Sequence, residues 1–144
     1  MACPDSFMEN RPQGLCVLVA DDDVDSARAL ADLLPYLCSA PMTTIVAFDG
    51  EQAARLATGA AKPHVVVMDI EMPVMDGFQA AIAIKLALGE LCPLLIAVSG
   101  NFDRVEFAAG GGLFDHTFGK PLQVGMLAAL LDSVSYAHER HGPT

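Results

Sequence analysis

The sequence predicts a single doubly wound α/β domain, in which helices cover both faces of a five-stranded parallel sheet. The first observation is that short apolar runs alternate with helical segments along the chain. The second is that these runs lack the polar alternation of a half-exposed strand, as expected for parallel strands buried on both faces. The third is the length of 144 residues, which suits one domain with a substantial core.

The elements follow one another as five strand–helix pairs. The first pair sets the apolar run 16–20 before a helix at 25–37, with Asp25 at its start and Pro35 marking its end. We expect Asp76 and Gly77 to form a turn and helix cap. The other strands are predicted at 43–48, 64–70, 93–100 and 116–119. The other helices are predicted at 49–59, 77–89, 102–111 and 122–138.

Composition excludes several classes of function. The chain has 8 Lys and Arg against 18 Asp and Glu, a net charge of −10, and no basic run, so we expect no direct binding of nucleic acid. No apolar stretch reaches the roughly 20 residues that span a bilayer. Residues 1–14 lack the basic and apolar regions of a secretory signal, and we expect them to be a flexible lead-in to a cytoplasmic protein. The cysteines show no CxxC spacing and are expected to be reduced and structural, with Cys3 alone in a loose segment.

Polar side chains follow four of the five predicted strands. Ligands of doubly wound folds bind outside the carboxyl ends of the strands, so these residues are the candidates for a site. Carboxylates follow two of the strands, a hydroxyl follows another and a lysine follows the last. The residues at these strand ends are Asp21, Asp22 and Asp23 after the first strand, Asp69 after the third, Ser99 followed by Gly100 after the fourth, and Lys120 followed by Pro121 after the fifth.

Four short motifs identify a family. They are "VLVADDD", "VVVMDIEMPVMDGFQA", "IAVSG" and "HTFGKPL", in this order. With them the chain resembles a response-regulator receiver domain of two-component signalling over about residues 15–138, which leaves 139–144 as a tail. The resemblance implies a flavodoxin-like sheet of strand order 2-1-3-4-5. That order places the first and third strands side by side, and with them Asp21 and Asp22 near Asp69.

The resemblance also implies roles for these residues. Asp69 accepts a phosphoryl group from a histidine kinase or a histidine phosphotransfer protein. Mg²⁺ neutralises the charge of this transfer, and its protein ligands are expected to be Asp21, Asp22, Asp69 and the backbone carbonyl of Glu71. Lys120 pairs with the acceptor and then with the phosphate, and the Ser99 hydroxyl turns toward the phosphate as the switch. The bond before Pro121 is expected to be cis.

The acidic cluster predicts a further property. Without a metal, two carboxylates about 4 Å apart repel by roughly 4 kcal/mol at an effective dielectric constant near 20. We therefore expect Mg²⁺ to stabilise the fold. The plainer interpretation of these acids is a helix start, because Asp is a good N-cap and favours the helix N-terminus.

Three features depart from the family pattern. Thr117 occupies a position that is often aromatic in the family, with His116 and Phe118 beside it, so coupling through a rotating ring is in doubt or is provided by a neighbour. Glu71 and Asn101 lie at the mouth of the expected site and could position or obstruct a hydrolytic water. The glycine-rich segment 108–112 is expected to be mobile, because glycine has the largest backbone entropy.

The function predicted is a phosphorylation-dependent signalling switch and not an enzyme acting on external substrates. Few residues follow the last helix, so the readout is expected to be a downstream protein or a second copy of the chain. One alternative is a phosphoryl carrier or sink, and another is an interaction module independent of phosphorylation. A small phosphohydrolase is disfavoured, since the sequence lacks the paired aspartates and the cap domain of that class.

Overall fold

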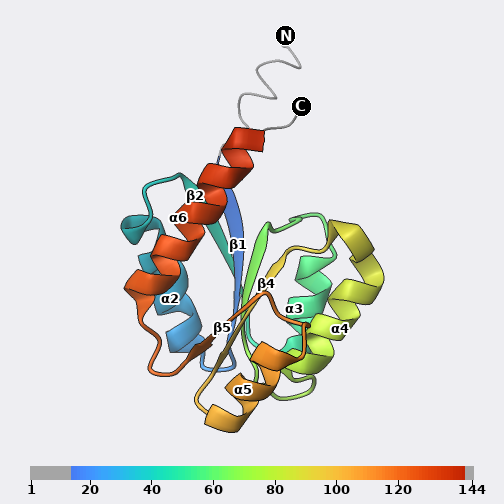
Figure 1. Ribbon diagram of the computed structural model, residues 1–144. Helices are drawn as coiled ribbons and strands as arrows, with labels where there is room; N and C mark the ends of the chain where they lie inside the picture. The colour runs from blue at the N-terminus through green and yellow to red at the C-terminus, as the bar shows by residue number, and fades with distance from the viewer. Residues whose placement is uncertain (1–13, 142–144) are drawn as a thin grey trace.

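The computed structural model describes residues 14–141. Within them, five strands form one parallel sheet in the order β2-β1-β3-β4-β5, so the predicted fold class and strand order are confirmed (Figure 1). The strands are β1 Leu15–Ala20, β2 Met42–Ala47, β3 Val65–Asp69, β4 Leu94–Ser99 and β5 His116–Gly119. The helices are α2 Val24–Leu37, α3 Gly50–Ala57, α4 Gly77–Leu88, α5 Phe102–Gly110 and α6 Val124–His141, with a 3-10 turn, η1, at Gly89–Leu91.

Two hydrophobic cores lie on opposite faces of the sheet. Alternate side chains of β1 enter different cores: Val17 and Val19 pack with residues of α2 and α6, and Leu18 packs with residues of α3 and α4. Figure 1 shows the same division, with α2 and α6 on one side of the sheet and α3, α4 and α5 on the other. Burial on both faces explains why the strand sequences are continuously apolar.

Helix α2 ends at Leu37 as predicted, but its N-cap and the place of its proline differ from the prediction. Its N-cap is Asp23 and not Asp25, because the Asp23 carboxylate accepts the backbone N–H groups of Asp25 and Ser26. Pro35 does not end the helix but lies inside it, and the helix continues for two residues to Leu37.

The hydrogen bonding of β2 compensates for this internal proline. Pro35 has no N–H to donate to the carbonyl oxygen of Ala31, four residues earlier in the helix. The Thr44 hydroxyl on β2 donates to that oxygen instead, at 3.1 Å. The missing donor therefore comes from a strand, which lets the helix tolerate the proline in its last turn.

The other helix ends agree with the sequence more closely. Asp76 caps α4 as predicted and forms a reciprocal capping box with Gln79. Helix α6 extends to His141, beyond its predicted end at 138, so part of the predicted tail is helical. Residues 1–13, which contain most of the predicted lead-in and Cys3, lie outside the described residues, as do 142–144. None of the helices described is both long enough and apolar enough to cross a membrane.

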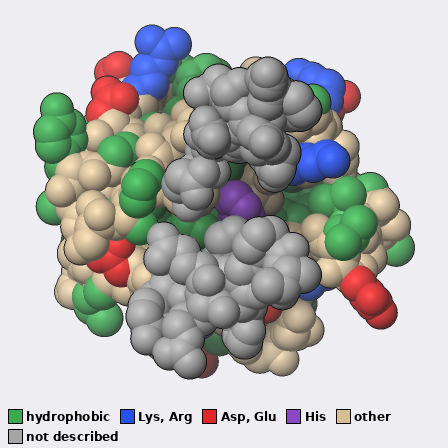
Figure 2. Space-filling model, turned by 90° about the horizontal axis from the view of Figure 1, so that it is seen from above, with side chains coloured by type: hydrophobic (Ala, Val, Ile, Leu, Met, Phe, Trp, Pro, Cys, Tyr) green, Lys and Arg blue, Asp and Glu red, His purple; other side chains and the backbone are tan. Residues whose placement is uncertain are grey.

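The two ends of the sheet have different surroundings. Figure 2 shows the end at which the strands begin, where acidic and basic side chains are scattered around the rim with hydrophobic side chains between them. The strands end on the opposite side of the molecule, next to the N-termini of the helices. The candidate residues lie at that second end.

Candidate functional site

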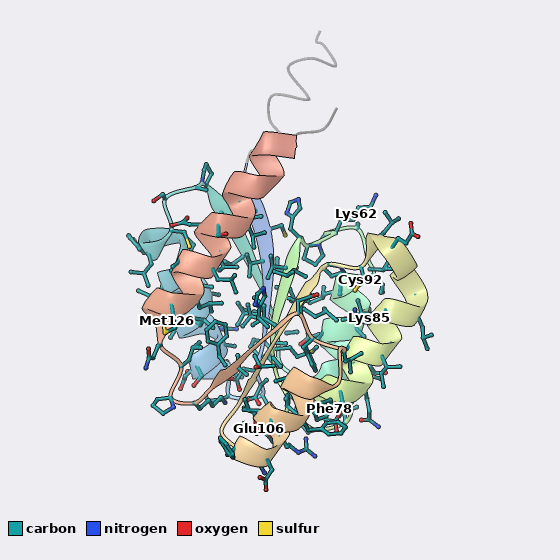
Figure 3. The ribbon with its side chains drawn as sticks, viewed as in Figure 1. Lys62, Phe78, Lys85, Cys92, Glu106 and Met126 are labelled. Atoms are coloured by element: carbon teal, nitrogen blue, oxygen red, sulfur yellow. The ribbon has the colours of Figure 1, made fainter. Side chains whose placement is uncertain are left out.

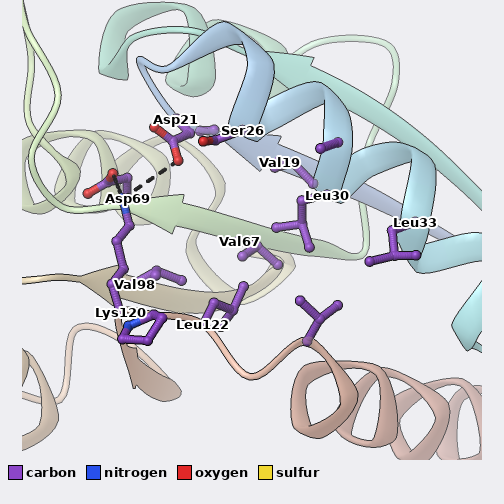
Figure 4. A pocket seen from close by; sticks show the side chains of 14 residues that line it. Val19, Asp21, Ser26, Leu30, Leu33, Val67, Asp69, Val98, Lys120 and Leu122 are labelled. Carbon is purple, nitrogen blue, oxygen red and sulfur yellow. Dashed lines mark hydrogen bonds and ion pairs between the residues drawn. The ribbon is translucent and has the colours of Figure 1, made fainter.

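The parallel sheet brings Asp21, Asp69 and Lys120 together at its carboxyl edge. Asp69 is the last residue of β3, Asp21 follows the neighbouring β1, and Lys120 follows β5. The Lys120 ammonium Nζ lies 2.6 Å from Asp69 Oδ2 and 3.7 Å from Asp21 Oδ2 (Figure 4). One cation therefore contacts two carboxylates that come from different strands.

Asp69 is the buried centre of this group, with 5% of its surface exposed. Its Oδ1 accepts the backbone N–H of Glu71 at 2.9 Å, and its Oδ2 accepts Lys120. Burial raises the pKa of the Asp69 carboxyl, and the two hydrogen bonds and the charge of Lys120 oppose that rise. The carboxylate is thus partly desolvated but held by two donors, which fixes its orientation.

The backbone next to Asp69 requires a glycine. The Gly77 N–H donates to the Ile70 carbonyl at 2.8 Å, so the start of α4 lies against the end of β3. A Cβ atom at position 77 would lie 2.8 Å from the Asp69 carbonyl oxygen, closer than side chains normally approach. Asp76 and Gly77 therefore serve two purposes: Asp76 caps α4, and Gly77 allows α4 to approach the end of β3 closely.

Asp21 and Asp22 add two more carboxylates. The Asp21 side chain is 16% exposed and accepts the Asp23 backbone N–H, whereas Asp22 is exposed. Burial raises the pKa of Asp21, and the negative charges of Asp69 and Asp22 contribute in the same direction. Such a concentration of acid is costly unless positive charge is close.

The three carboxylates fit a divalent cation. Asp21, Asp22 and Asp69 each offer one oxygen, and these oxygens lie within 4.8 Å of one another. At bond lengths of about 2.0–2.1 Å, oxygens on one Mg²⁺ lie about 2.9 Å apart in adjacent positions and about 4.2 Å apart in opposite positions, so the three carboxylates would bind the ion by moving closer together or in part through water. Hard carboxylate oxygens also suit this ion chemically.

Lys120 remains a cation in this site. Burial acts to lower the pKa of Lys120, but the hydrogen bond and charge of Asp69, with the charge of Asp21, raise it overall. The peptide bond between Lys120 and Pro121 is cis, which agrees with the expectation from the resemblance. The Lys120 backbone N–H donates to the Ser99 carbonyl at 3.0 Å and thereby ties β5 to β4 at the site.

Ser99 follows Val98, the register partner of Asp69, but its hydroxyl does not donate to the Asp69 carboxylate. This side chain is almost completely buried, with 1% exposed, and its hydroxyl donates to both carboxylate oxygens of Glu71, at 2.9 and 2.8 Å. Its Oγ also accepts the Asn101 backbone N–H at 3.0 Å. The Glu71 carboxylate in turn lies 3.8 Å from Nε of Arg104 on α5.

These contacts extend beyond the residues that the sequence singled out. From the sequence, Glu71 was expected to provide only a backbone ligand and to lie at the mouth of the site, and no role was predicted for Arg104. No motif marks either contact, because they depend on which way two long side chains turn. The one available signal was the acidic residue two positions after Asp69, in a loop that the fold places beside Ser99.

Thr117 and its aromatic neighbour lie on different faces of β5. Phe118 is half-buried and packs against the core that contains α2 and α6. Successive side chains of a strand point to opposite faces, so Thr117 points toward the other face of the sheet. Phe118 therefore cannot take the place of the aromatic side chain that the family often has at position 117.

A largely apolar cleft of about 360 Å³ adjoins the carboxylates. Figure 4 shows Asp21, Asp69 and Lys120 at one end of it and aliphatic side chains along the remainder. These aliphatic side chains include Leu30, Leu33, Val67, Val98 and Leu122.

The cysteines that the structure describes form no disulfide with one another. Burial raises the pKa of the thiols of Cys16, Cys38 and Cys92, which keeps them protonated and weakly nucleophilic. Their packing agrees with the structural role expected from the sequence.

Comparison with known proteins assigns the family. Residues 17–132 match the family described as the response regulator receiver domain. The chain belongs to this family. The receiver domain is 35% identical over 130 residues to the transcriptional regulatory protein PrrA of Mycobacterium tuberculosis, covering 89% of this chain and 52% of PrrA. It is 31% identical over 121 residues to a probable chemotaxis protein CheY of Rhizobium etli, covering 82% of this chain and 90% of that protein.

Other relatives are considerably longer than the receiver domain. A protein-glutamate methylesterase/protein-glutamine glutaminase of Cupriavidus pinatubonensis is 40% identical over 96 residues, which cover 63% of this chain but 27% of that protein. The chain thus spans about half or less of the length of the first curated relatives that it matches.

Solved structures show the same fold. The N-terminal domain of an uncharacterized Wolinella succinogenes protein (WS1339) aligns with a TM-score of 0.76 at 27% identity, covering 89% of this chain and 99% of that one. The receiver domain of the sensor histidine kinase PA1611 from Pseudomonas aeruginosa aligns with a TM-score of 0.70 at 24% identity, covering 83% and 96%. That structure has a magnesium ion coordinated in its active-site cleft.

Proposed function

We propose that this receiver domain is a phosphorylation-dependent switch whose acceptor is Asp69. The observation that carries the proposal is the ion pair of 2.6 Å between Lys120 and a carboxylate that is 5% exposed, next to the acids Asp21 and Asp22. An anionic nucleophile must meet an anionic phosphoryl group here, so a fixed cation and a cation-binding cluster beside the nucleophile suit this chemistry.

The transfer uses residues already in place. An oxygen of Asp69 attacks the phosphorus of a phosphohistidine, the new O–P bond forms as the N–P bond breaks, and the imidazole leaves with the electron pair. The Glu71 backbone N–H and the Lys120 ammonium hold the carboxylate in one orientation during the attack. Lys120 then stays with the phosphoryl oxygens, and Ser99 provides the hydroxyl that turns toward them.

Asp21, Asp22 and Asp69, with the backbone carbonyl of Glu71, are the residues that would hold Mg²⁺. The bound ion would neutralise charge on the phosphoryl oxygens during transfer. The magnesium-bound receiver domain of PA1611 has the same fold and supports the choice of this ion.

The partners follow from this chemistry. The donor is a histidine kinase or a histidine phosphotransfer protein, each of which presents a phosphorylated imidazole. The readout is a downstream protein or a second copy of the receiver. Either would recognise the surface that changes when Asp69 is modified.

The test is phosphorylation by a small donor. The receiver is incubated with acetyl phosphate and Mg²⁺, and intact mass is expected to show one added phosphoryl group that requires the metal. Asp69→Asn is expected to remove the adduct. Asp76→Asn changes another acid of the same motif to a residue that is also a good N-cap, and is expected to keep it. An adduct that survives in Asp69→Asn would refute the assignment.

A further inference from the structure

We infer that the Glu71 carboxylate is a latch, which holds the Ser99 hydroxyl away from the acceptor until a phosphoryl group competes for it. The inference rests on the proposed function and adds a positioning residue to it. The latch is defined as the contact between the Glu71 side chain and the Ser99 hydroxyl, with Arg104 as the next residue in the chain of contacts.

The hydrogen bonds of Ser99 leave no proton for the acceptor. A serine hydroxyl has one proton, and here it points to the two Glu71 oxygens at 2.8 and 2.9 Å. The Asn101 N–H occupies the acceptor side of the same oxygen at 3.0 Å. With 1% of the side chain exposed, water cannot easily replace either partner. Ser99 must therefore release Glu71 before it can donate to a group on Asp69.

The exchange is favourable only when a stronger acceptor arrives. A hydroxyl donating to a carboxylate forms a charge-assisted bond, stronger than a bond between neutral groups. A phosphoryl group on Asp69 carries more negative charge than Glu71 and repels the Glu71 carboxylate. It therefore both attracts the hydroxyl and weakens the latch, which makes the opening dependent on phosphorylation.

Arg104 connects the latch to the helices. The Glu71 side chain is 44% exposed and able to move, and it lies 3.8 Å from Nε of Arg104. The Arg104 guanidinium also lies over the ring of Phe78, 5.6 Å from its centroid. Phe78 in turn meets Phe107 of α5 edge to face, with ring centroids 5.3 Å apart. Figure 3 shows Phe78 where α4 approaches α5.

This arrangement gives a path for the signal. Arg104 divides its interactions between Glu71 and Phe78, so movement of Glu71 changes the balance between the two. Phe107 is 69% exposed, which puts the end of this path at the surface of α5. Opening of the latch thus changes contacts between α4 and α5, and Thr117 takes no part in this change.

The first experiment titrates the protein with beryllofluoride in the presence of Mg²⁺, as a mimic of the phosphoryl group. Glu71→Ala removes the latch from the unmodified state and is expected to tighten binding by roughly tenfold to 100-fold, the size of one hydrogen bond to a charged group. Glu71→Gln keeps an acceptor without charge and is expected to give a smaller gain. Glu106→Gln, an exposed acid on α5, is the matched control and is expected to bind as the wild type does (Figure 3).

A double substitution separates the latch from simple repulsion. Loss of the Glu71 charge could tighten binding of an anion without involving Ser99, and that effect would persist when Ser99 is absent. The latch predicts that Glu71→Ala gains clearly less in a Ser99→Ala background, where only the lost repulsion remains. An equal gain in both backgrounds would overturn the inference.

A second readout needs no phosphoryl group. In the unmodified wild type, NMR couplings of the Ser99 methylene are expected to report one rotamer, and in Glu71→Ala they are expected to report averaging, with faster hydrogen exchange at the Asn101 amide. An unchanged Ser99 in Glu71→Ala overturns the latch, whatever beryllofluoride does. If Ser99 is released but wild type does not respond to beryllofluoride with Mg²⁺, the proposed function fails and the latch contact stands.

Discussion

The two sides of Asp69 are built differently. The acidic side is formed by Asp21, Asp22 and Lys120. There the buried Asp69 carboxylate lies 2.6 Å from the Lys120 ammonium. On the hydroxyl side, formed by Ser99, Glu71 and Arg104, the ion pair is 3.8 Å long and its side chains are 44% and 40% exposed. The acidic side is in place before any reaction, whereas on the hydroxyl side Ser99 donates to a carboxylate that a stronger acceptor can replace.

This difference corresponds to two tasks. Transfer of a phosphoryl group requires charges that are oriented before the reaction, because reorganisation during the reaction adds to the barrier. A switch requires two arrangements that differ by a small free energy, so that one new group can change their populations. The acidic side suits the first requirement, and the hydroxyl side suits the second.

The largest expected effect is on reactivity at the acidic side. Lys120→Met keeps the length of the side chain and removes its charge, so we expect phosphorylation by acetyl phosphate to slow by about 100-fold, as for other fixed electrostatic groups. Intact mass followed over time measures the rate. Lys85→Met, on α4, is the control and is expected to leave the rate unchanged. A Lys120→Met protein that reacts at the wild-type rate would show that the ammonium is only structural.

The same substitution is expected to affect stability. Lys120→Met leaves Asp69 buried without its cation, and we expect the free energy of unfolding to fall by about 1–3 kcal/mol. The lower part of this range is favoured because the Lys120 side chain is 40% exposed and water partly replaces it. Urea unfolding without metal measures the change. In an Asp69→Asn background the loss should largely disappear, and an undiminished loss would trace it to packing rather than to charge.

The sequence predicts the acidic side and the place of Ser99, but not the side-chain contacts of the hydroxyl side, for a physical reason. Asp69 ends a strand, and Asp21 and Lys120 directly follow one, so strand order alone determines where these three residues meet. The latch depends on side-chain rotamers in segments far apart in the chain: Glu71 follows β3, Ser99 ends β4 and Arg104 lies on α5. Local patterns contain no information about such contacts.

The fold shows the same limit in α2. The apolar spacing predicted the helix and its extent well, but Pro35 was wrongly taken as its end. The donor that rescues the Ala31 carbonyl is Thr44, which belongs to another element and is visible only after the fold is known. Similarly, "DDDVD" offers several possible caps, and the geometry of the loop selects Asp23 over Asp25.

The next prediction concerns Mg²⁺ and distinguishes the two sides. The metal relieves repulsion in the acidic cluster, so a concentration about tenfold above its Kd is expected to stabilise the protein by about 1.4 kcal/mol. Thermal unfolding should show a rise in Tm of about 3–6 °C. Asp22→Asn is expected to remove most of this response, and Glu71→Gln, which keeps the backbone carbonyl, is expected to retain it. A protein that gains no stability from Mg²⁺ would mean that the acids are not a metal site.

The smallest expected effect is at the outer end of the hydroxyl side. Arg104 and Arg28 form a natural matched pair, since their guanidinium carbons lie 5.6 and 5.7 Å from the ring centroids of Phe78 and Phe48. In the part of the chain that the structure describes, Arg104 also forms an ion pair, with Glu71, and Arg28 forms none. Substitution of each by Met should therefore remove a similar cation–π contact and differ by the ion pair alone.

That difference is expected to be at most about 0.5 kcal/mol in the free energy of unfolding, since the Glu71–Arg104 pair is long and exposed. It should also vanish in 1 M salt, where the screening length falls to about 3 Å. Urea unfolding of Arg104→Met and Arg28→Met at low and high salt measures it. A difference above about 1.5 kcal/mol that persists in salt would make the hydroxyl side as rigid as the acidic side. A side that rigid could not release Ser99 when Asp69 is phosphorylated.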